Sequence, residues 1–121
     1  DSIRAGVKVM INNSTLINNK TTKRYGNNPT IEEILTVYAE KSEPYLNALE
    51  EKTNFTRDTA INFFDGNQMN QLIKFMIEHE MGSEAFYNYY PPENQLLLDK
   101  MIFEGYTRGI NSYGGKLGKL N

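Results

Sequence analysis

Cysteine is missing from all 121 residues of the sequence. Its absence excludes disulfides, thiolate zinc sites and cysteine nucleophiles, but it leaves the compartment open because exported proteins can also lack cysteine. An excess of basic charge is missing as well, since 13 Lys and Arg residues face 15 Asp and Glu residues and the net charge is −2. Neutralising nucleic-acid phosphates requires a basic surface, so we expect no nucleic-acid partner.

Long apolar runs and common ligand-binding fingerprints are also missing. The longest apolar candidate, residues 69–77, is interrupted by Asn70, Gln71 and Lys74, whereas a membrane span needs about 20 apolar residues. The chain contains no G-x-S-x-G element, P-loop or dinucleotide fingerprint, and "SYGGKLGK" at 112–119 lacks the Ser or Thr that completes a phosphate loop. We therefore expect no membrane span and no cofactor.

Helical periodicity is the main pattern that the sequence does contain. Capping residues mark two helix starts: Thr30 with Glu33 forms a capping box, and Asp65 precedes an amphipathic stretch that Gly82 ends. Ser42 is the predicted cap of a helix between these two. A first helix from Asp1 or Ser2 and a last helix over 96–105 complete the set. Their apolar stripes include Ile3, Val7, Met10, Ile11, Ile31, Ile34, Leu35, Tyr45, Leu46, Leu49, Met69, Leu72, Ile73 and Met76.

The pattern of these stretches predicts the fold class and the domain organisation. No strand alternation and no internal repeat occur, so we predict an all-α, small single-domain bundle of about five helices over residues 1–110. Residues 12–29 are expected to form an Asn-rich loop or a frayed helix end. Residues 111–121 are expected to form a Gly-rich flexible tail or linker. The irregular segment 54–67 is expected to cross the core, since it holds Phe55, Ile61, Phe63 and Phe64. Residues 85–93 are expected to be a tyrosine-dense connector.

The stretch "MIEHEMG" at 76–82 carries the strongest chemical signal. Glu80 lies seven residues after Ile73 and four after Met76, so helical geometry places it on the apolar side, while Glu78 points elsewhere. Burial and the negative end of the helix dipole both favour a protonated carboxyl group, and a raised pKa suits a general acid. His79 is expected to be a boundary residue, and one helix end offers too few ligands for zinc.

Two other interpretations of these residues remain open. Glu80 extends into solvent or forms a structural ion pair with Arg4, Arg57 or Arg108, and a buried pair with Arg4 would lower the pKa of the carboxyl group. The aromatic residues after the helix form either a shelf that stacks on sugar rings or ordinary core and boundary contacts. The members of this candidate substrate-binding shelf are Tyr87, Tyr89 and Tyr90, together with Phe86, Asn88 and Tyr106.

Three stretches together resemble a known family. "IRAGVKVMI" at 3–11, "TIEEILTVYAEKSEPYLNAL" at 30–49 and "LIKFMIEHEMG" at 72–82 are similar to a small helical domain of bacteriophage virion and prophage proteins. The third stretch also resembles the catalytic-glutamate helix of lysozyme-like lytic transglycosylases. The resemblance implies Glu80 as the acid and Ile3, Arg4 and Ala5 as the opening motif. No G-L-M-Q-type segment follows Glu80.

The resemblance leads to two functional hypotheses. The first is a virion-associated module of a tail or ejected protein that binds or cleaves host peptidoglycan, with lytic transglycosylase or muramidase-like activity carried by Glu80. The second is a non-catalytic structural or assembly domain of the virion. The expected partners are other virion proteins and, in the first case, peptidoglycan glycan strands. The expected location is the virion and, during entry, the host periplasm. The start "DSIRAG" suggests a segment of a longer protein.

Overall fold

The computed structural model describes residues 2–14 and 28–115 of the chain, and this part is an all-α bundle, as predicted. An isolated antiparallel bridge between Thr30 and Ala60 is the one extended pairing among these residues. The elements are α1 (Ser2–Ser14), α2 (Ile31–Tyr38), α3 (Ser42–Lys52), α4 (Gly66–Met81), α5 (Ser83–Tyr89), the short 3-10 helix η1 (Pro92–Asn94) and α6 (Gln95–Tyr113).

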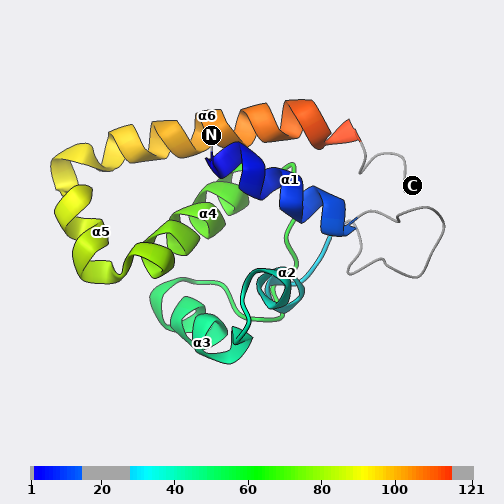
Figure 1. The fold of residues 1–121 in the computed structure, drawn as a ribbon, viewed down its shortest axis with the longest axis horizontal. Coiled ribbons are helices and arrows are strands. Elements are labelled where there is room, and N and C mark those ends of the chain that lie inside the picture. Colours follow the sequence, from blue (N-terminus) through cyan, green and yellow to red (C-terminus); the bar gives the residue numbers. More distant parts are fainter. Residues whose placement is uncertain (1, 15–27, 116–121) are drawn as a thin grey trace.

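The long helix α6 forms one side of the molecule, and α2 and α3 form the opposite side (Figure 1). Helix α1 packs along α6, and α4 packs against both α6 and α3. Helix α5 turns the chain between α4 and α6 at one end of the bundle (Figure 1). The core is therefore a single apolar cluster to which every α-helix contributes.

The predicted caps are confirmed at two helix starts. The hydroxyl of Thr30 accepts a hydrogen bond from the Glu33 amide while the Glu33 carboxylate accepts one from the Thr30 amide, and Asp65 accepts from the first amides of α4. Gly82 ends α4 with φ = +86°, a backbone conformation that favours glycine. The predicted cap at Ser42 is wrong, because α3 begins at Ser42 itself and its N-cap residue, Lys41, makes no side-chain cap.

Two predicted boundaries after α4 are also wrong. Residues 83–89 form α5 instead of a connector, since Gly82 ends one helix and directly starts the next. Helix α6 continues to Tyr113, past the predicted end at Gly105, so the first residues of the predicted tail are helical. Gly105 and Gly109 are buried in α6, and the missing side chain of Gly109 allows Val7 of α1 to pack closely there. Residues 116–121 of the predicted tail and 15–27 of the predicted loop lie outside the described residues.

The segment between α3 and α4 crosses the core, as predicted. Phe55, Ile61 and Phe63 are buried, but Phe64 is 56% exposed, so the expectation fails for this one residue. The backbone of the same segment completes the start of α2: the carbonyl groups of Thr59 and Arg57 accept hydrogen bonds from the amides of Ile31 and Glu32, at 2.9 and 3.0 Å. The first amide groups of a helix have no hydrogen-bond partner within the helix. Two of these groups in α2 obtain a partner in this way.

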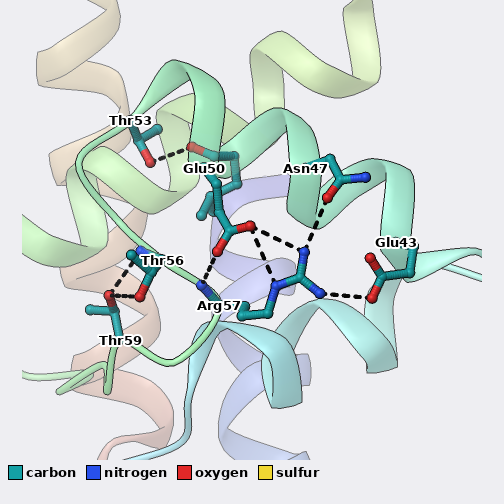
Figure 2. A network of polar contacts seen from close by, with 8 residues as sticks. Glu43, Asn47, Glu50, Thr53, Thr56, Arg57 and Thr59 are labelled. Atoms are coloured by element: carbon teal, nitrogen blue, oxygen red, sulfur yellow. Dashed lines mark hydrogen bonds and ion pairs between the residues drawn. The ribbon is translucent and has the colours of Figure 1, made fainter.

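Arg57 ties this segment to α3 (Figure 2). Its guanidinium group donates to Glu43 at 2.7 Å, to Asn47 at 3.1 Å and to Glu50 at 3.1 Å, and its backbone amide donates to the second Glu50 oxygen at 3.0 Å. Hydrogen bonds from Arg57 hold the pKa of Glu50 below its usual value. Arg57 is therefore a structural cation of the loop and does not serve as the predicted alternative partner of Glu80.

None of the helices in residues 2–14 and 28–115 combines the length and the apolar character that crossing a membrane requires.

Candidate functional site

The charged residues in the last turn of α4 have different surroundings. Glu80 is exposed, so the expectation that it faces inward is wrong. The stripe that predicted its position is real, since Met69, Leu72 and Ile73 are buried. Beyond Ile73, however, the same side of α4 faces an open groove in place of a packed core. Glu80 therefore lies at the rim of that groove and not inside the protein.

The groove has a volume of about 450 Å³ and runs between α1, the end of α2 and the second half of α4. Its walls are mainly apolar, and Gly6 on α1 leaves the space open because it carries no side chain. Among the residues that the structure describes, Glu80 is the only one with a full charge that lines the groove. The apolar walls are formed chiefly by Ile3, Val7, Met10, Ile73, Met76 and Ile77.

The hydroxyl groups of Tyr38 and Tyr45 have different surroundings. The hydroxyl of Tyr38 donates to the Gly6 carbonyl, and burial raises the pKa of Tyr38 to about 12. Tyr45 is 3% exposed, and its buried hydroxyl has no hydrogen-bond partner among the described residues. Burial raises the pKa of Tyr45, and the negative charge of Glu80 raises it further. Tyr38 lines the groove, whereas Tyr45 is not among the described residues that do so.

His79 packs its ring against aromatic neighbours. The ring lies 4.0 Å from the ring of Tyr45 and 5.7 Å from that of Phe75, measured between centroids, and the residue is half-buried. These contacts are those of the boundary residue that the sequence predicted.

Glu78 is the carboxylate of this turn that has the most polar partners. It accepts hydrogen bonds from Lys52 at 3.1 Å, from Ser83 at 2.9 Å and from the hydroxyl of Tyr87 at 3.1 Å. Burial alone would raise the pKa of Glu78, but these hydrogen bonds outweigh it and lower the pKa below its usual value. The network joins α3, α4 and α5, so Glu78 is a structural carboxylate and is not suited to act as a general acid at neutral pH.

Replacing Glu78 by glutamine should make the stability of the protein less dependent on pH. A carboxyl group whose pKa is lower in the folded than in the unfolded state stabilises above its ordinary pKa, about 4.3, and loses this contribution as the pH falls through the folded value. Urea unfolding should therefore show a larger stability difference between wild type and Glu78→Gln at pH 7 than at pH 3. Glu40→Gln, at an exposed position outside any proposed contact, is the control. A difference that stays constant with pH would contradict this prediction.

The structure divides the predicted aromatic shelf. Tyr87 and Tyr89 are exposed on α5, whereas Tyr90 is half-buried and Tyr106 is buried with its hydroxyl bonded to the Phe63 carbonyl at 2.7 Å. Tyr87 lines a polar hollow together with Glu78, not the groove that holds Glu80. The proposed acid and the proposed sugar shelf therefore do not share one cleft.

Arg4 also differs from expectation. It is exposed, and its guanidinium carbon lies 5.4 Å from the centre of the Tyr113 ring on α6. A contact of this kind is a cation–π interaction. The predicted pair of Arg4 with Glu80 is not among the ion pairs within residues 2–14 and 28–115.

The outer face of α6 is an apolar surface that the sequence reasoning missed. Leu96 is 83% exposed and Phe103 is 56% exposed, and Leu97 and Met101 are exposed beside them. Lys100 and Glu104 lie between these apolar residues, also exposed. We use the name "outer α6 face" for these six residues. The sequence already indicated this apolar surface, because residues 96–103 include apolar side chains on more than one side of the helix.

The described residues contain no group of three or more His, Asp or Glu side chains that could hold a metal ion. The groove supplies one carboxylate and apolar walls, which suits binding of an apolar group better than cleavage of a polar glycan. Comparison of the chain with protein-family models, with curated proteins and with solved structures finds no match.

Proposed function

We propose that this chain is a non-catalytic assembly domain of a bacteriophage particle, and that copies of it pair through the outer α6 face. The resemblance of three sequence stretches to virion domains supports the first part. The partners of the domain in the particle would be other virion proteins. The exposed apolar side chains of α6 support the second part, because soluble monomers rarely leave large contiguous apolar patches uncovered.

The arrangement of charges on α6 favours a second copy as the occupant. In a pair of antiparallel helices related by a two-fold axis, each residue faces the residue equally far on the other side of the axis. An axis midway between Lys100 and Glu104 places each lysine opposite the glutamate of the other copy. The same axis places Met101 of each copy opposite Phe103 of the other. The face is thus complementary to itself in both charge and apolar contact.

The exposure of Glu80 makes catalysis the less favoured hypothesis. A glutamate that acts as a general acid near neutral pH depends on an apolar, desolvated environment to raise its pKa. Glu80 is exposed, and the partially buried carboxylate of the same helix end, Glu78, is held in its charged form by three donors. Assembly requires none of these groups to transfer a proton.

Reversing single charges should weaken the dimer, and mixing the two reversed variants should restore it. Lys100→Glu and Glu104→Lys each replace two attractions by two repulsions, which should weaken self-association about tenfold. A mixture of the two variants regains both attractions and should form heterodimers. Sedimentation velocity at increasing concentration measures this. One helix pair buries less than a standard interface of about 1,600 Å², so we expect a weak dimer.

Matched variants separate the outer α6 face from general charge effects. Glu51→Lys on α3 and Lys41→Glu before α3 change the net charge by the same amounts at exposed positions away from α6, and both should associate as wild type does. A wild-type protein that stays monomeric at the highest concentration would contradict pairing through α6. Clearing of cell-wall gels by wild type, lost in Glu80→Gln, would contradict the non-catalytic assignment.

A further inference from the structure

The groove between α1 and α4 has the properties of a binding site for a small molecule. Its volume of about 450 Å³ falls within the range of about 300–1,000 Å³ that is typical of ligand pockets. Such sites combine apolar walls with a few polar groups that orient the ligand. Here the walls are aliphatic and thioether side chains, and the polar groups are Glu80, Tyr38 and Ser2.

The charge at the groove favours a cationic ligand. The first turn of α1 and the last turn of α4 both border the groove, and their dipoles carry partial charges of opposite sign that oppose each other. The carboxylate of Glu80 is the only full charge among the described residues that line the groove, and it therefore gives this part of the groove a negative charge. An anionic head group would be repelled, whereas an ammonium group would gain a counter-ion.

We propose that the groove binds a small cationic amphiphile, an alkyl chain that ends in an ammonium group, with the chain between α1 and α4 and the ammonium group at Glu80. The site is separate from the outer α6 face, so it does not depend on the proposed assembly function. No bond is made or broken in this binding.

The five methionines make the proposal directly testable. Met10, Met76 and Met81 line the groove, whereas Met69 is buried in the core and Met101 is exposed on α6. In a titration of methyl-labelled protein with octylammonium, we expect the NMR signals of the three groove methionines to shift and saturate, while those of Met69 and Met101 stay in place. Lengthening the alkyl chain should tighten binding by about fourfold per methylene. Shifts confined to Met101 would overturn the proposal.

Two variants test the charge and the space separately. Glu80→Gln should weaken octylammonium binding about two- to fivefold and leave octanol binding unchanged, whereas the exposed Glu84→Gln on α5 should bind as wild type. Gly6→Leu should fill the groove and abolish binding, with Ala5→Leu, at an exposed position of the same helix, as its control. Tighter binding of octanoate than of octylammonium, or identical affinities in wild type and Glu80→Gln, would overturn the assignment of a cationic ligand. That result does not bear on pairing through α6.

Discussion

Replacing Gly109 by alanine should lower the free energy of unfolding by about 1–3 kcal/mol, although the same change in an ordinary helix interior raises it by about 0.5–1 kcal/mol. A β-carbon at position 109 would lie 2.6 Å from both the Cβ and the Cγ1 atoms of Val7. Carbon atoms that are not bonded to each other do not approach this closely, so α1 and α6 would have to separate. Both residues are buried, so the separation would disturb the main contact between the two helices.

Gly115 provides the matched control for this change. A β-carbon there would meet no atom within 4 Å, so Gly115→Ala should leave stability nearly unchanged. Urea unfolding followed by circular dichroism gives the free energies of both variants and of wild type. If Gly109→Ala is as stable as wild type or more stable, then α1 and α6 do not pack as closely as described.

Removing the hydroxyl group from Tyr106 and from Tyr45 should change stability in opposite directions. Tyr106 donates a buried hydrogen bond of 2.7 Å to the Phe63 carbonyl, and its loss in Tyr106→Phe should cost about 1–2 kcal/mol. Tyr45→Phe removes a buried hydroxyl that has no partner among the described residues, so it should stabilise the free protein by about 1 kcal/mol. The chemical change is the same in both variants, and only the surroundings differ.

Thermal and urea unfolding of the two phenylalanine variants measure this difference in sign. Equal destabilisation would mean that the Tyr45 hydroxyl also has a hydrogen-bond partner, contrary to the structure. A stabilised Tyr45→Phe variant would instead show that the hydroxyl group lowers the stability of the wild-type protein.

Most of the helical architecture could be predicted from local sequence patterns. The capping box at Thr30 and Glu33, the cap at Asp65 and the glycine at position 82 depend only on neighbouring residues, so their prediction was confirmed. The buried stripe of α4 was predicted for the same reason. Boundaries without such signals were predicted less well, as at Ser42 and at the end of α6.

The candidate site could be predicted only in part. The helical repeat correctly placed Glu80 on the side of Ile73 and Met76, but it could not show whether another element covers that side. The structure leaves a groove there, so Glu80 is exposed at its rim and Glu78 has the denser polar contacts. The partners of Glu78 lie on α3 and α5, at sequence distances that no helical repeat covers.

The sequence by itself determined which segments of this protein are helical and which side of each helix is apolar, because propensity, capping and periodicity act over a few residues. Only the tertiary structure decided what each apolar side meets. It buried α1 against α6 through the absence of a side chain at Gly109, left the groove beside Glu80 open, and kept the outer α6 face uncovered. These outcomes depend on contacts between residues far apart in the chain, which local patterns do not encode.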